Sequence, residues 1–211
     1  MQCSDILTLI GIFASAFFGI FSIFQSAHQT KRSNDLDLFE KRIDVYRVIR
    51  DISNCIDQNA YLIESENDVN KIITASFLCS MITNAESLEG LCVDMKHPLK
   101  DNNLHRKYLF KKQELTNIGE MAPMVFKTQG EEIRQVVLSY LNFVNSLYLY
   151  QIWYEDRISQ VDNEKFMPSH LDNANEAQKK DHQLIVNTWN KLKEDYNKLD
   201  LAMIKNQTTL F

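Results

Sequence analysis

The pattern of apolar and polar residues begins with an uncharged run at positions 6–24, ILTLIGIFASAFFGIFSIF. A helix needs roughly 20 predominantly apolar residues to cross a bilayer core, so this run predicts one transmembrane helix. A cleaved signal peptide is a poorer match, because no Lys or Arg precedes the run and an h-region rarely exceeds about 15 residues. A buried core helix is the remaining alternative.

One face of this predicted helix carries small residues. Gly11, Ser15 and Gly19 are spaced four apart and Ser22 continues the stripe, whereas phenylalanines occupy the other faces. Small residues at this spacing let two helix backbones approach closely, and serine hydroxyls can bond between helices. The stripe predicts a transmembrane packing face and a homo-oligomer formed through it. The alternative is that the stripe faces lipid.

Positive charge gives the expected orientation. Many basic residues follow the apolar run and none precedes it; the nearest are Lys31, Arg32, Lys41, Arg42, Arg47 and Arg50. Basic residues are retained on the cytoplasmic side of a membrane. We therefore expect a single-pass membrane protein, with its N-terminus outside and its C-terminal domain in the cytoplasm.

The remainder of the chain reads as helices. Apolar residues recur three and four positions apart from residue 36 to residue 56, which predicts an amphipathic helix over 33–63. This helix either begins at a cap at Ser33 or Asn34 or continues directly from the membrane helix. Few Gly and Pro residues interrupt the later segments. The predicted fold is all-α: a transmembrane anchor, residues 1–30, and an antiparallel bundle of four to five helices, residues 31–211.

Four further boundaries are expected within the bundle. A second helix over 69–89 is expected to end at Gly90, and a third over 103–118 at Gly119 and Pro123. Thr128 and Glu131 have the spacing of a capping box at the start of a long fourth helix. A last helix follows Pro168 and Ser169 and includes residues 184–203, after which residues 206–211 are expected to fray.

The long helix contains a second uncharged stretch, residues 136–154, which raises the question of a second membrane span. Its amides and hydroxyls are costly in lipid and its apolar residues keep a helical period, so a core helix is the favoured interpretation. Its aromatic residues accordingly predict core packing. The alternative is membrane interaction through Tyr140, Phe143, Tyr148 and Trp153, because Tyr and Trp favour the bilayer interface.

The sequence shows no catalytic pattern. It contains no phosphate-binding glycine loop, no HExxH and no G-x-S-x-G, and none of its five histidines lies four residues from another. The four cysteines form no CxxC pair. We therefore expect no catalytic site, no metal and no cofactor, and an enzyme with an unrecognised site is the least favoured class. The net charge of −5 gives no reason to expect a nucleic-acid partner.

Two segments together carry a resemblance to known proteins. The apolar anchor followed by LFEKRIDVYRVI, with Phe39, Lys41, Arg42 and Tyr46, is similar to small bacterial membrane proteins that include accessory proteins of anti-phage systems and transmembrane effectors encoded beside retrons. The resemblance covers about 45 residues and implies no catalytic position. Retron effectors of this kind usually have two membrane helices, so the resemblance would need residues 136–154 as the second.

The function expected from these observations is non-enzymatic. The leading hypothesis is a membrane-anchored effector of an anti-phage abortive-infection system, which oligomerises and perturbs the inner membrane. Its expected partners are the lipid bilayer, further copies of the chain and a cytosolic protein from a neighbouring gene. The alternative is a membrane-tethered scaffold that binds a cytosolic partner without disrupting the membrane.

Overall fold

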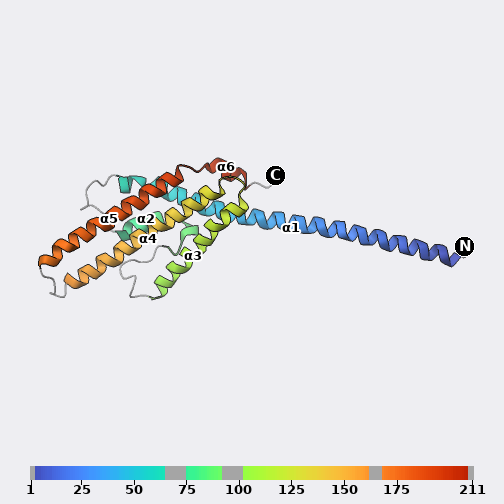
Figure 1. Ribbon diagram of the computed structural model, residues 1–211, viewed down its shortest axis with the longest axis horizontal. Helices are drawn as coiled ribbons and strands as arrows, with labels where there is room; N and C mark the ends of the chain where they lie inside the picture. The colour runs from blue at the N-terminus through green and yellow to red at the C-terminus, as the bar shows by residue number, and fades with distance from the viewer. Residues whose placement is uncertain (1–2, 65–74, 92–101, 162–167, 209–211) are drawn as a thin grey trace. The chain divides into compact units, whose positions relative to one another are not determined.

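The structure is a computed structural model that describes residues 3–64, 75–91, 102–161 and 168–208. Side chains are not described at residues 3–17, 61–64, 75–78, 102, 153–161, 168–179, 181 and 182. All regular secondary structure in the described residues is helical, which confirms the all-α prediction (Figure 1). The elements are α1 (Cys3–Glu64), α2 (Ala75–Ile82), the 3-10 helix η2 (Glu86–Leu88), α3 (Asn102–Val125), α4 (Gly130–Val161), α5 (Pro168–Tyr196) and α6 (Leu201–Asn206).

Helix α1 is a single helix of 62 residues. The sequence explains its length, because residues 20–89 contain neither Gly nor Pro. The prediction of a helix over 33–63 is confirmed, and so is its direct continuation from the preceding apolar helix. Ser33 and Asn34 therefore lie inside a helix and cap nothing.

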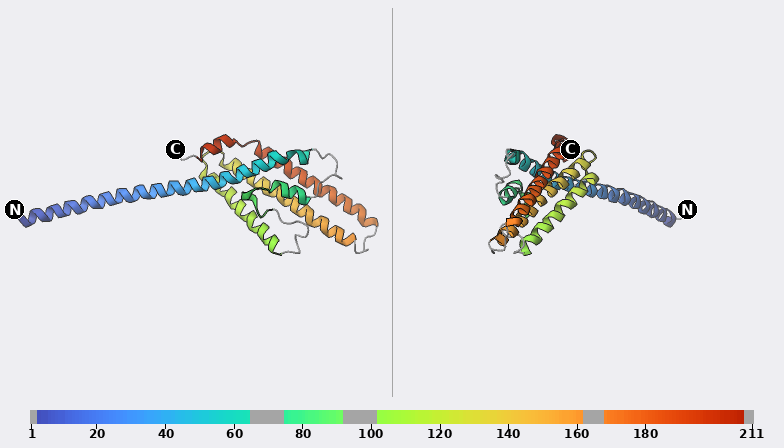
Figure 2. Two further views of the ribbon diagram at one scale, coloured as in Figure 1. Left: turned by 180° about the vertical axis from the view of Figure 1, so that it is seen from behind. Right: turned by 60° about the vertical axis from the view of Figure 1, so that its left-hand side comes forward.

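The chain divides into two compact units, Met1–Lys41 and Arg42–Phe211. Every buried residue in the described part of the chain lies between Val45 and Ile204, so the hydrophobic core belongs to the second unit. Within that unit α4 packs against α3, α5 and α2. Figures 1 and 2 show α3, α4 and α5 side by side, with α4 antiparallel to both neighbours. The expected antiparallel packing is therefore present in these three helices.

Polar side chains join the helices of the second unit. Asn59 of α1 donates to the Met81 carbonyl at 3.4 Å, and the Tyr140 hydroxyl of α4 donates to the Ile82 carbonyl at 2.7 Å. Both bonds satisfy carbonyls that the C-terminal turn of α2 leaves without a helical partner. They fix the end of α2 against two other helices.

This end of α2 corrects the predicted helix over 69–89. Residues 65–74 lie outside the described part of the chain, and the helix ends at Ile82 rather than at Glu89. The Thr83 hydroxyl donates to the Cys79 carbonyl at 2.7 Å, and the chain then makes the 3-10 turn η2. Gly90 does adopt the left-handed conformation, with φ of 97°, but after that turn rather than after an α-helix.

Helix α3 corrects the predicted end of the third helix, because it runs through Gly119 and Pro123 to Val125. A Cβ on Gly119 would lie 3.1 Å from Val137 Cγ1 of α4, so this glycine permits close packing of the two helices. Pro123 lies in the last turn, so the N–H that it lacks removes one i→i−4 bond, and only two residues of the helix follow it.

The predicted capping box is wrong. Helix α4 starts at Gly130, after Gln129 with φ of 65°. The Thr128 hydroxyl contacts Met203 Sδ and accepts a bond from Gln207 instead of capping the helix. The last predicted helix is also interrupted: α5 ends at Tyr196 and α6 begins at Leu201.

Candidate functional site

The described part of the first unit exposes large apolar side chains in consecutive turns of α1. Phe18, Ile20, Phe21, Ile23 and Phe24 are 57% to 72% exposed. At about 100° per residue these positions lie at about 0°, 200°, 300°, 140° and 240° around the helix axis. A helix that packs on a protein core is apolar on one face only. This segment is apolar on most of its circumference.

The remaining arc holds the small residues. On the same scale Ser22 lies at about 40° and Gly19 at about 100°, between two of the large side chains. Both residues are exposed, and a Cβ placed on Gly19 would meet nothing within 4 Å. Gly11 and Ser15, the other members of the predicted packing face, lie in α1, but their side chains are outside the described residues.

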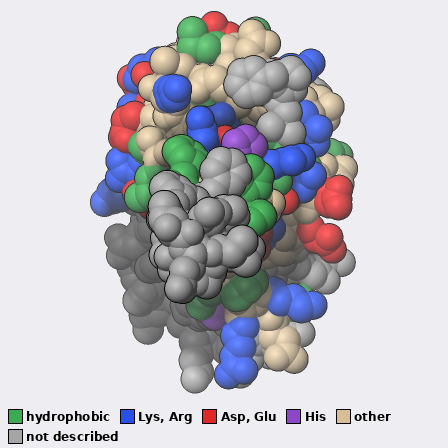
Figure 3. Space-filling model, turned by 90° about the vertical axis from the view of Figure 1, so that its right-hand side faces the viewer, with side chains coloured by type: hydrophobic (Ala, Val, Ile, Leu, Met, Phe, Trp, Pro, Cys, Tyr) green, Lys and Arg blue, Asp and Glu red, His purple; other side chains and the backbone are tan. Residues whose placement is uncertain are grey.

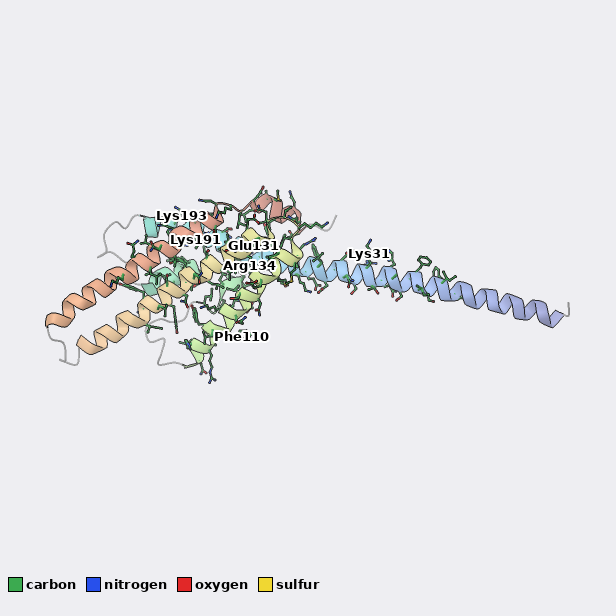
Figure 4. All side chains as sticks on the ribbon, viewed as in Figure 1. Lys31, Phe110, Glu131, Arg134, Lys191 and Lys193 are labelled. Carbon is green, nitrogen blue, oxygen red and sulfur yellow. The ribbon has the colours of Figure 1, made fainter. Side chains whose placement is uncertain are left out.

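Where side chains are described, no helix is both long enough and apolar enough to cross a membrane. Residues 6–17 of the predicted transmembrane segment lie outside those described side chains. The segment is followed by the exposed side chains of Lys31 and Arg32; Figure 4 labels Lys31 on α1.

The aromatic residues of α4 lie in the core of the second unit. Tyr140, Phe143 and Tyr148 are at most 3% exposed, and Trp153 lies outside the described side chains. Phe143 packs on Trp189 of α5 with ring centroids 5.2 Å apart, and Tyr148 stacks on Tyr108 of α3 at 4.4 Å. In this structure they do not face lipid, and the structure supports core packing for residues 136–152 rather than a second span.

A polar network between α3 and α4 was not expected from the sequence. His105 Nδ1 lies 2.6 Å from the Tyr148 hydroxyl, and the Tyr108 hydroxyl and Lys112 both donate to Asn145 Oδ1 at 3.1 Å. Burial raises the pKa of both tyrosines, and the Tyr108 phenol is the donor in its bond to Asn145. The α3 residues of this network lie 33 to 43 residues before their α4 partners, and the sequence gave no reason to group the two sets.

Cys55 is a buried free cysteine of the second unit. Burial, with a contribution from the negative charge of Asp51, raises the pKa of the Cys55 thiol to about 11. A thiol protonated at neutral pH is a poor nucleophile. No three His, Cys, Asp or Glu side chains among the described residues come together as a metal site requires.

Several charged side chains on the surface form ion pairs. Arg134 donates to Glu120 at 3.0 Å and to Glu131 at 2.8 Å; Figure 4 labels Arg134 and Glu131 on α4. On the face seen in Figure 3, Lys and Arg side chains are intermingled with Asp and Glu side chains. Such a surface favours solubility of a domain over steering of a highly charged ligand.

Comparison with known proteins gives no relative for this chain: no protein-family model, no curated protein and no solved structure matches it.

Proposed function

We propose that this protein is a non-enzymatic, membrane-anchored effector of a bacterial anti-phage system of the abortive-infection type. Its helix over residues 6–24 spans the inner membrane, and the helical unit Arg42–Phe211 lies in the cytoplasm. Effector action is the assembly of several copies through the membrane helix, which perturbs the bilayer.

One observation carries the membrane anchor: five large apolar side chains of residues 18–24 are more than half exposed and cover most of the helix circumference. Water around such a segment is unfavourable, at roughly 25 cal/mol per Å² of apolar surface. A bilayer removes this cost for every face of the helix at once. The basic residues that follow the segment support a cytoplasmic position for its C-terminal side.

The small-residue face supports assembly. Gly19 and Ser22 occupy the arc that the large side chains leave free, and Gly11 and Ser15 share it by sequence spacing. The resemblance of the anchor and the segment around Phe39 and Arg42 to accessory proteins of anti-phage systems supports the defence role. The lipid bilayer and further copies of this chain are the partners that this mechanism requires.

Membrane fractionation and a membrane-potential dye test the proposal in bacteria that express the full chain. We expect the protein in the membrane fraction after an alkaline wash, and loss of potential with rising expression. Gly19→Ile adds bulk to the small-residue face and should keep the protein in the membrane while abolishing the loss of potential. Phe21→Ile, on another face, is the matched control and should retain both properties. Intact chain in the soluble fraction, or unchanged potential at every expression level, would reject the effector.

The burial of Tyr140, Phe143 and Tyr148 favours a second candidate function, a tethered scaffold. A helix whose aromatic residues are packed and hydrogen bonded is a stable part of a binding domain rather than a segment ready to insert in lipid. The scaffold predicts that residues 42–211 alone capture a cytosolic partner encoded nearby. It also predicts that neither the full chain nor this fragment affects the membrane potential.

A further inference from the structure

Gln207, just after α6, connects three segments of the second unit. Its side chain accepts from the Lys127 amide at 3.2 Å and donates to the Thr128 hydroxyl at 2.7 Å, both in the α3–α4 connection. Its carbonyl accepts from Arg42 of α1 at 3.4 Å. A second glutamine bond joins the same two segments from the other side: Gln129, in the α3–α4 connection, accepts through Oε1 from the Asp200 amide at 2.8 Å. The segment that was expected to fray is therefore held in place at residues 206–208.

Arg42 is the residue that this arrangement holds. It is the first residue of the unit Arg42–Phe211, and its Nε donates to the Val125 carbonyl, the last of α3, at 2.6 Å. A bond from a guanidinium to an unpaired helix carbonyl is charge-assisted and stronger than a neutral one. Arg42 thus joins α1 to the ends of α3 and α6 at the point where the core-forming part of α1 begins.

The attachment of α6 rests mainly on exposed polar bonds. Helix α6 has six residues, and Ile204 is its single buried side chain. Asp200 caps it through a bond from the Met203 amide at 2.9 Å. The bonds that join Asp200 and Gln207 to the α3–α4 connection are exposed to solvent. Elements with little apolar burial and solvent-exposed bonds open more often than a packed core.

We propose that α6 and Gln207 form a releasable clasp that holds α1 at Arg42 and restrains the assembly of the membrane helix. The clasp is closed in this structure. Opening of α6 removes the Gln207 bonds and leaves Arg42 with Val125 alone, so the start of the core-forming part of α1 is freed from the C-terminal segment. This regulation rests on the proposed effector function.

Hydrogen exchange of the full-length protein in lipid nanodiscs tests whether the clasp opens. We expect amides of residues 201–208 to exchange faster than those of residues 136–147. Gln207→Ala should raise exchange at 201–208 by roughly fivefold to tenfold, the effect of losing one or two net hydrogen bonds, without changing 136–147. Lys205→Ala, on the exposed side of the same helix, should change neither segment. Equal exchange in the Gln207→Ala variant and the wild type would overturn the clasp.

Membrane potential in cells tests whether the clasp restrains activity. Gln207→Ala and Arg42→Gln should depolarise cells at lower expression than the wild type, whereas Lys41→Gln, which removes the same charge one residue earlier, should match the wild type. Identical thresholds for all four chains would overturn the regulation. If the wild type never depolarises cells, the proposed effector function fails and its regulation with it, while the exchange result still decides whether α6 opens.

Discussion

At the scale of single residues, the buried carboxylate of Asp195 shows how the second unit holds its helices. Asp195 of α5 is 3% exposed and accepts a 2.6 Å bond from the Ser139 hydroxyl of α4. Burial alone would raise the pKa of Asp195, but bonds from Ser139, Lys191 and Lys198 outweigh it and the pKa is lowered. The ionised form is therefore the one that stabilises the fold; Figure 4 labels Lys191 on α5.

Ser139→Ala should destabilise the protein by about 1–3 kcal/mol at pH 7, because it removes one bond to a buried charge. The stability supplied by a carboxyl with a lowered pKa is complete above its unfolded pKa of about 3.9 and is lost as the pH falls through the folded value. The cost of the substitution should therefore shrink below about pH 4. Urea unfolding in detergent, at pH 7 and below about pH 4, measures the free energy of unfolding of the variant and the wild type. Asn142→Ala, on the exposed side of α4, is the control, and an equal cost at both pH values would contradict the argument.

At the scale of elements, sequence periodicity predicts a helix well where no tertiary contact competes. The long α1 and α4 follow from apolar spacing, from the absence of Pro within them, and from the absence of Gly over residues 20–64 and 131–161. The end of α3 could not be predicted in this way. Gly119 and Pro123 are typical of a helix terminus, but Gly119 is required by the approach of Val137 and the buried residues Ala122 and Val125 keep the helix intact.

The sequence predicts the local part of the candidate site, but not the part that depends on contacts between distant residues. The apolar run and its small face are local patterns, and the described positions Gly19 and Ser22 lie on one arc of α1. The clasp was not predictable, because Arg42, Val125 and Gln207 are brought together only by the fold. Thr128 has the sequence signature of a cap, and its hydroxyl is engaged by Gln207 instead.

The close contact between α3 and the start of α4 gives a prediction for Gly130. A Cβ at this position would lie 2.7 Å from Pro123 Cα and 2.9 Å from the Ala122 carbonyl, which are backbone atoms that cannot rotate away. Gly130→Ala should cost about 2 kcal/mol or more. Gly119→Ala would bring its Cβ no closer than 3.1 Å to Val137 Cγ1 and 3.2 Å to Val137 Cβ, which asks for a smaller shift, so it should cost less. Urea unfolding compares the two variants, and the reverse order would show that the α3–α4 connection can relax.

At the scale of the whole molecule, the two units differ in what can stabilise them. The unit Arg42–Phe211 contains every buried side chain in the described part of the chain, from Val45 to Ile204. The unit Met1–Lys41 has none among its described side chains. Among the described residues, the second unit therefore has a core of its own and the first unit has none.

This difference predicts that residues 42–211 fold without the first 41 residues. The fragment should be helical by circular dichroism and unfold cooperatively, with a melting temperature within about 4 °C of the full chain in detergent, a shift equivalent to roughly 1 kcal/mol. The reason is that removal of residues 1–41 deletes no core side chain, and Arg42, which anchors the clasp, is retained. A matched fragment that begins at residue 47 loses Arg42 and the buried Val45 and should melt at a lower temperature. Failure of the longer fragment to unfold cooperatively would mean that the core depends on the membrane helix, and the proposed division of the protein into an anchor and an autonomous domain would be wrong.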